Sequence, residues 1–187
     1  MILTESRLRE LTSHAVILDE ARVQTRTFSE ANSRLSVFLS HKHSDIEYLE
    51  RIRYILESLN ASVYVDWAAP SMQHPTDRNT AEALKRKIER YDKFIFIATD
   101  AAIASKWCNW EIGYGDAHKY SQDKIAIFPV KQDNRVWEGN EYLQLYPSIE
   151  YFDGTTKYKN GTPIPKGFYV YYRFRREIIP LTRWISK

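Results

Sequence analysis

The stretch that decides the fold is Phe94-Ile95-Phe96-Ile97-Ala98-Thr99. It is apolar at successive positions, so both faces of an extended strand would be buried, as in the centre of a parallel sheet. It is followed by Ser105-Lys106-Trp107-Cys108-Asn109-Trp110-Glu111, which opens a helix predicted to run to about Tyr120. Trp107 and Glu111 are four residues apart and therefore share one face of that helix. An aromatic ring and a carboxylate are thus predicted side by side where a buried strand ends.

Strand and helix patterns alternate on both sides of this stretch. Short runs typical of strands cover residues 35–40, 63–66 and 125–130. Helical periodicity with one apolar face covers residues 45–60 and 79–91. Ser44 and Glu47 form a predicted capping box at the start of the first helix, and Asn79 is the predicted N-cap of the second. The resulting β-α-β-α-β-α-β order predicts an α/β fold of the flavodoxin-like kind, with a doubly wound parallel sheet.

The two ends of the chain fall outside this pattern. Residues 1–33 carry an apolar stripe at helical spacing and are predicted to form an N-terminal helical extension. Residues 34–152 form the predicted central domain, with Ile149–Phe152 as a fifth strand at the edge of the sheet. Residues 153–187 are predicted to be a C-terminal extension packed on that domain, aromatic, basic and partly helical from Phe168 onward.

Composition narrows the class of function. The 187 residues are 43% hydrophobic and 27% charged, the balance of a soluble globular protein. A formal net charge of +3 is too small to indicate a nucleic-acid partner. A single cysteine allows no internal disulfide, and no apolar run reaches the roughly 20 residues that cross a bilayer. With no secretion signal at Met1, these features predict a cytoplasmic protein without a membrane partner.

Candidate site residues follow from a rule for open parallel sheets, whose ligands bind beyond the carboxyl ends of the strands. The rule points to the residues that follow each strand, including His43, Thr99 and Asp100. The candidate site residues taken from them are Ser40, His41, Lys42, Asp45, Asp66, Trp67, Trp107 and Glu111. These hydroxyl, imidazole, ammonium, carboxylate and indole groups suit a polar ligand with aromatic rings. Roles as loop, cap, turn or packing residues remain open for each of them. His41 and His43 have no third ligand at metal spacing, so zinc is not predicted.

Three blocks of the sequence resemble bacterial TIR domains, the Toll/interleukin-1 receptor fold. They are Val37–His41, Val63–Trp67 with the loop after it, and Trp107–Glu111, which fits the W-x-x-x-E pattern of enzymatic TIR domains. The resemblance covers about residues 34–152. The loop Ala69–Pro75 lacks the glycine of receptor-type TIR loops and is similar to that of stand-alone bacterial TIR proteins, including those of Thoeris-type antiphage systems.

The resemblance implies an NADase that cleaves NAD+ at the nicotinamide–ribose bond, with NAD+ as substrate and no bound cofactor. It implies that Glu111 is the catalytic carboxylate and that the other selected residues bind substrate. The implied product is a cyclic ADP-ribose or related signal in antiviral defence, sensed by a separate effector protein, with homo-oligomerisation on activation. Two alternatives stay open: a non-catalytic TIR interaction scaffold, and an enzyme like the nucleoside deoxyribosyltransferases, whose carboxylate attacks a deoxyribose.

Overall fold

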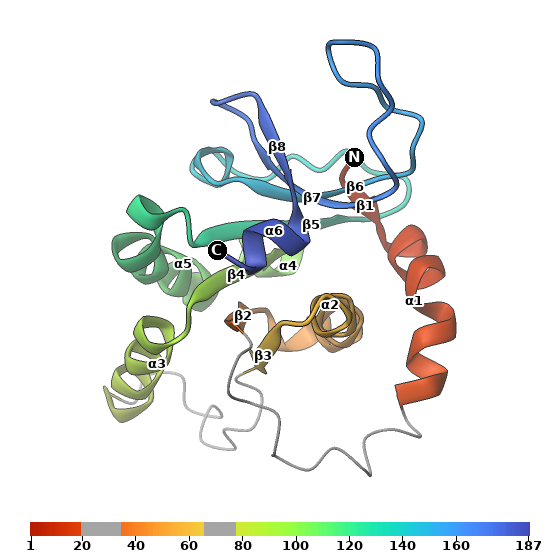
Figure 1. The fold of residues 1–187 in the computed structure, drawn as a ribbon. Helices are drawn as coiled ribbons and strands as arrows, with labels where there is room; N and C mark the ends of the chain where they lie inside the picture. The colour runs from red at the N-terminus through yellow and green to blue at the C-terminus, as the bar shows by residue number, and fades with distance from the viewer. Residues whose placement is uncertain (20–34, 66–77) are drawn as a thin grey trace.

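The computed structural model describes residues 1–19, 35–65 and 78–187 (Figure 1). Its strands are β1 Leu3–Thr4, β2 Ser36–Ser40, β3 Ser62–Val65, β4 Lys93–Ala98, β5 Ile125–Lys131, β6 Ser148–Phe152, β7 Gly167–Tyr172 and β8 Glu177–Pro180. Within the described residues they form one sheet in the order β3-β2-β4-β5-β6-β7-β8, with β1 paired to β5. The pairs from β3 to β6 are parallel, so the predicted flavodoxin-like α/β fold is confirmed.

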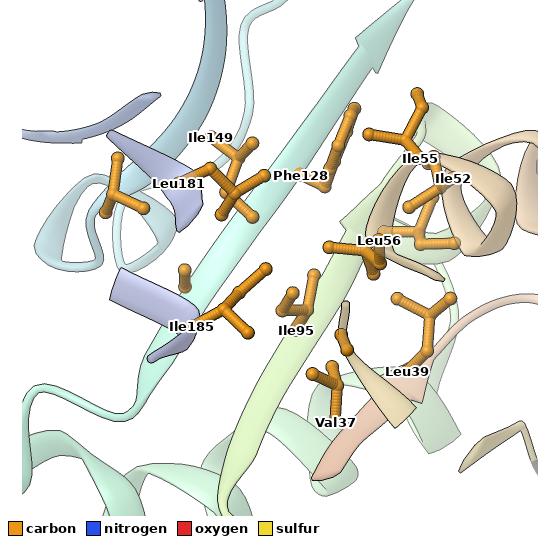
Figure 2. Packing of buried hydrophobic residues seen from close by; sticks show 14 of the residues in the cluster. Val37, Leu39, Ile52, Ile55, Leu56, Ile95, Phe128, Ile149, Leu181 and Ile185 are labelled. Atoms are coloured by element: carbon orange, nitrogen blue, oxygen red, sulfur yellow. The ribbon is translucent and has the colours of Figure 1, made fainter. Parts of the chain in front are cut away.

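Helices cover both faces of this sheet (Figure 1). They are α1 Glu5–Asp19, α2 Ile46–Ser58, α3 Arg78–Arg90, α4 Asp100–Ile103, α5 Lys106–Lys119 and α6 Leu181–Ile185, with short 3-10 turns η2 His43–Asp45, η4 Tyr120–Gln122 and η5 Leu143–Leu145. Successive side chains of β4 point to opposite faces. Ile95 packs in one core with α2 and α6, as Figure 2 shows, and Phe94 packs in another with α3 and α5. All six residues of β4 are buried, as predicted for a central strand.

The C-terminal segment, predicted to be partly helical, also contains two strands that were not predicted. β7 pairs antiparallel with β6, and β8 pairs antiparallel with β7. Only Leu181–Ile185 is helical. The reason is the run Phe168–Tyr172, in which aromatic and β-branched side chains favour a strand over a helix. Because β6 pairs with β5 on one side and with β7 on the other, it is an internal strand, and the predicted edge position was wrong.

Two predicted helix starts are also wrong. Residues His43–Asp45 form η2, so α2 begins at Ile46 and has no side-chain cap. Asn79 lies inside α3, which already includes Arg78. Both errors come from assigning a cap by residue type alone, although the polar side chain can find a tertiary partner instead. Helix ends are therefore less predictable than the helices themselves.

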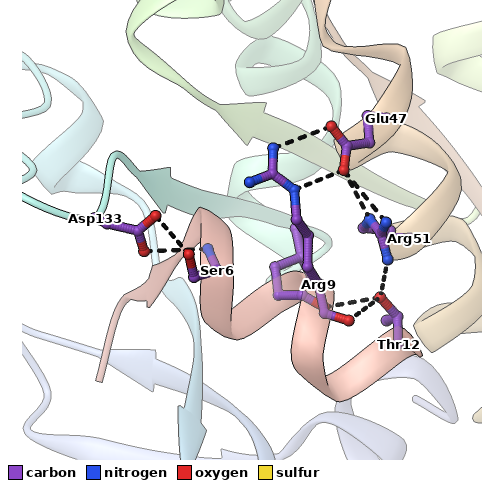
Figure 3. Close-up of polar contacts among 7 residues, drawn as sticks. Ser6, Arg9, Thr12, Glu47, Arg51 and Asp133 are labelled. Atoms are coloured by element: carbon purple, nitrogen blue, oxygen red, sulfur yellow. Dashed lines mark hydrogen bonds and ion pairs between the residues drawn. The ribbon is translucent and has the colours of Figure 1, made fainter. Parts of the chain in front are cut away.

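Polar contacts tie α1 to the rest of the fold (Figure 3). Arg9 Nε donates to Glu47 Oε1 on α2 at 2.7 Å, so Glu47 serves this ion pair rather than a capping box. Arg51 on α2 donates to Thr12 Oγ1 at 2.8 Å. Ser6 Oγ donates to Asp133 Oδ2 at 2.6 Å, just beyond β5. The predicted N-terminal helix is thus present to Asp19, and the predicted helical residues 20–33 lie outside the described residues.

Candidate functional site

A buried hydrogen bond joins the end of β2 to α5. Ser40, the last residue of β2, is 1% exposed, and Glu111, in the second turn of α5, is 5% exposed. The Ser40 hydroxyl donates to Oε2 of Glu111. The structure therefore brings together two of the residues selected from the sequence, at the carboxyl edge of the sheet. A carboxylate in this position is shielded from bulk water, which strengthens its electrostatic effect on a neighbouring charge.

The close approach of α5 to the sheet brings Glu111 to this position. Gly115 lies one turn further along the same helix, and a Cβ there would lie 3.1 Å from Cδ2 of Phe94 on β4. A Cβ at this distance is a tighter contact than most, so the Phe94 ring would have to shift by a few tenths of an ångström to accept a larger residue. The helix starts at a defined point, because Ser105 is its N-cap and its hydroxyl accepts from the Cys108 amide at 3.4 Å. The sequence analysis did not identify Gly115. The available signal was a glycine inside a predicted helix, which can mark a position where another element packs closely.

A second buried contact links the loop after β2 to the end of β4. The Thr99 hydroxyl donates to Oδ2 of Asp45, and Ser44 Oγ lies 3.1 Å from the other carboxylate oxygen. Thr99 also caps α4, because its hydroxyl accepts from the Ala102 amide at 3.0 Å. Asp45 is 5% exposed. Its observed contacts thus hold two strand ends together, and its predicted role in substrate binding stays a prediction.

The pKa of the Cys108 thiol reflects the charged groups at this edge of the sheet. Burial raises the pKa of the Cys108 thiol to about 11, with the carboxylates of Glu111 and Asp45 raising it and the ammonium of Lys42 lowering it. The thiol is therefore protonated at neutral pH and unsuited to nucleophilic attack. Its Sγ donates to the His41 carbonyl at 3.4 Å. The thiol thus lies within the field of two predicted site carboxylates and of Lys42.

Trp107 begins a row of aromatic rings along α5. Its ring centroid lies 4.9 Å from that of Trp110, which in turn stacks on Tyr114 at 6.0 Å. The Trp107 side chain is half-buried, and its indole nitrogen Nε1 is buried without a hydrogen-bond acceptor in the described part of the chain. A buried N–H with no acceptor is costly to the folded state.

The remaining predicted residues are only partly described. His41 and Lys42 are half-buried at the rim, and the Lys42 carbonyl accepts from the Asp45 amide at 2.8 Å. Asp66 and Trp67 lie outside the described residues, as does the loop Ala69–Pro75. Among residues 1–19, 35–65 and 78–187, no cluster of three His, Cys, Asp or Glu side chains has the arrangement of a metal site. Over the same ranges, no helix combines the length and hydropathy needed to span a bilayer.

The loop between β5 and β6 adds contacts that the sequence did not predict. Trp137 Nε1 donates to the carbonyl of Ala98, the last residue of β4, at 2.9 Å. The Tyr142 hydroxyl donates to Oδ1 of Asn109 on α5. The first contact fixes the loop against the end of β4, and the second fixes it against the start of α5. No periodic pattern marked this loop, and its aromatic residues were the only available signal.

Comparison with known proteins gives this geometry a family. The TIR domain family matches residues 37–162, which include both Ser40 and Glu111. A "Probable 3' cyclic ADP-D-ribose synthase ThsB'" of Bacillus cereus (strain MSX-D12) is 31% identical over 124 residues, 64% of this chain and 63% of that protein.

The match to a second relative covers fewer residues. A "Putative cyclic ADP-D-ribose synthase TIR2" of Cytobacillus dafuensis is 30% identical over 81 residues, 42% of this chain and 21% of that protein. Each match therefore spans less than two thirds of the relative's length. The family match covers the parallel core from β2 to β6 and confirms the resemblance to bacterial TIR domains seen in the sequence. The chain belongs to the TIR domain family.

Proposed function

We propose that this TIR domain protein cleaves the nicotinamide–ribose bond of NAD+ and forms a cyclic ADP-ribose, with Glu111 as the catalytic carboxylate. The observation that carries the proposal is the buried Ser40–Glu111 hydrogen bond at the carboxyl edge of the parallel sheet. Ligands of such sheets bind at this edge. The two relatives are named as synthases of cyclic ADP-D-ribose, which supports the same chemistry here.

One carboxylate is sufficient for this reaction. Nicotinamide is a cationic substituent in NAD+ and leaves as a neutral base, so no general acid has to protonate it, unlike the oxygen leaving group of a glycoside. Positive charge develops on the ribose as the bond breaks. The Glu111 carboxylate stabilises that charge and accepts a hydrogen bond from a ribose hydroxyl. Ser40 holds the carboxylate in one orientation before substrate arrives.

The outcome of the reaction depends on what attacks the ribosyl cation. Attack by the adenosine part of the same molecule closes a ring, and attack by water releases plain ADP-ribose. Trp107 is suited to exclude water, because it is large, half-buried and lies one turn before Glu111 on the same face of α5. Lys42 and His41 at the rim are proposed to meet the pyrophosphate, whereas Asp45, Asp66 and Trp67 are proposed as further substrate contacts.

The proposal also includes the substrate, the use of the product as a signal and the assembly of the protein. NAD+ is the substrate and no separate cofactor is required. The product is a signal for a separate effector protein in Thoeris-type antiphage defence, and the protein assembles with further copies of itself on activation in the cytoplasm.

The decisive experiment is incubation of the full chain with NAD+, followed by chromatography with mass detection. We expect release of nicotinamide together with a product that has the mass of a cyclic ADP-ribose. Protein concentration is raised stepwise, because assembly is expected to promote activity. Base release from deoxynucleosides instead of NAD+ would identify a deoxyribosyltransferase. Absence of turnover of either substrate over the whole concentration range would leave the interaction scaffold.

A further inference from the structure

A pocket lies at the other end of the sheet from Glu111, where β4 begins. It is formed by the start of β4, the turn before β5, the β7–β8 hairpin and α6. Its lining includes Lys93, Asp123, Tyr172, Arg175, Trp184 and Lys187. The cavity volume is about 170 Å³. A single water needs roughly 10–15 Å³ on the same measure, so the pocket has room for a small polyatomic ion.

Lys93 is a buried cation without an anionic partner in this pocket. The residue is 2% exposed. Its ammonium lies 4.6 Å from the ring centroid of Trp184, and no hydrogen-bond acceptor or carboxylate contacts it in the described part of the chain. Lys119 provides a contrast, because it is 6% exposed but donates to the carbonyl of Glu89 at 3.0 Å and to that of Tyr91. Lys93 therefore faces the cavity without the carbonyl acceptors that Lys119 has.

Of the neighbouring acids, Asp92 is engaged outside the pocket and Asp123 is paired with Arg175 within it. Asp92 accepts from the amide of Ser36 at 2.8 Å and from its hydroxyl at 2.7 Å. Asp123 accepts from two nitrogens of Arg175, at 2.8 and 2.6 Å. Glu177 also lines the pocket and is exposed on β8.

The neighbouring cations add to the positive field. Burial is the main reason why the pKa of Lys93 is lowered to about 8. The ammonium groups of Lys124 and Lys187 act in the same direction, and Asp92 and Asp123 act against it. The pocket thus combines the ammonium of Lys93, which faces the cavity and lacks a carboxylate partner there, with further positive groups. Removing a lysine from bulk water lowers the stability of its charged form. A bound anion would offset that cost.

We propose that this pocket binds a small anion that carries a phosphate group, with Lys93 at its base and Arg175 and Lys187 at its mouth. A guanidinium has five N–H donors, so Arg175 can hold Asp123 and still contact an anion. Lysine is an established point-charge ligand for phosphate. Tyr172, Arg175, Trp184 and Lys187 come from the segment after β6, so the C-terminal hairpin and α6 complete a site that the parallel core alone would leave open.

The test follows the indole resonance of Trp184 in the full chain labelled with 15N-tryptophan. The chain has five tryptophans, and Trp184→Phe assigns the resonance. Trp184 Nε1 donates to the Asp123 carbonyl at 2.9 Å, so this N–H reports directly on the pocket. Inorganic phosphate is titrated against chloride at equal ionic strength and without NAD+. We expect a saturable shift of the Trp184 resonance with phosphate and none with chloride.

Matched lysine variants separate the pocket from general surface charge. Lys93→Met should abolish the phosphate-dependent shift, Lys187→Met should weaken binding several-fold, and Lys166→Met, at an exposed loop position, should bind like the wild type. A wild-type resonance that does not respond to phosphate would overturn the proposal, and so would an undiminished response in Lys93→Met. If Lys93→Met does not fold, the wild-type and Lys187→Met titrations decide the matter. NAD+ turnover is not part of this readout, so it is independent of the proposed activity.

Discussion

Replacing Glu111 with glutamine tests the proposed chemistry most directly. Glutamine has nearly the same shape, so it fits the space of a side chain that is 5% exposed. Its amide carbonyl can still accept from the Ser40 hydroxyl. Only the negative charge is removed, which makes Glu111→Gln a change of electrostatics rather than of packing.

The expected magnitudes differ sharply for stability and for rate. A hydrogen bond to a charged group contributes about 1.5–3 kcal/mol and a neutral one about 0.5–1.5 kcal/mol, so stability falls by roughly 1 kcal/mol. Relief of the cost of burying a charge offsets part of that loss. Removing one preorganised stabiliser of transition-state charge costs roughly 2.7–4 kcal/mol of activation free energy. NAD+ turnover should therefore fall by roughly 10²–10³-fold while the fold is retained.

The assay is the initial rate of nicotinamide release, measured by chromatography at several protein concentrations. Thermal unfolding followed by circular dichroism checks that the variant is folded. Glu141→Gln is the matched control, because Glu141 is exposed in the loop between β5 and β6 and should leave the rate unchanged. A rate for Glu111→Gln within a factor of about three of the wild type would correspond to well under 1 kcal/mol and would refute the assignment.

Three further variants extend these expectations. Ser40→Ala removes the donor that orients Glu111, so nicotinamide release should fall roughly 10-fold, by the loss of about 1.4 kcal/mol; an unchanged rate would show that the hydroxyl is dispensable. Trp107→Ala should shift the product mixture from cyclic to plain ADP-ribose, and an identical chromatogram would reject its role in excluding water. The pKa of Lys93 is lowered to about 8, below the roughly 10.4 of the unfolded chain, so wild-type stability should rise with pH between these values. Lys93→Met lacks the titrating group, so its stability should not show this rise. In denaturant unfolding at pH 7 it should be more stable than the wild type by up to roughly 3 kcal/mol, reduced by the lost attraction between Lys93 and Trp184. The difference should shrink toward pH 11. A wild-type stability that is flat over that alkaline window would contradict the shift.

The sequence by itself determined the parallel core and the register of α5. The apolar run of β4 is buried on both faces, and helical periodicity is a local property, so the alternation of strands and helices could be predicted. The same periodicity placed Glu111 beyond the end of a central strand. The end of the chain was less predictable, because Phe168–Tyr172 becomes a strand only by pairing with β6.

Only the tertiary structure decided what each polar group contacts. Ser40 and Glu111 are 71 residues apart in the chain, and Asp45 and Thr99 are 54 apart. No local pattern records such pairs, because they form when sheet pairing brings the carboxyl ends of separate strands together. The burial of Lys93 beside Trp184 arises in the same way, from a C-terminal segment folding against the start of β4. Local periodicity therefore sets where elements form, and long-range packing sets which side chains meet.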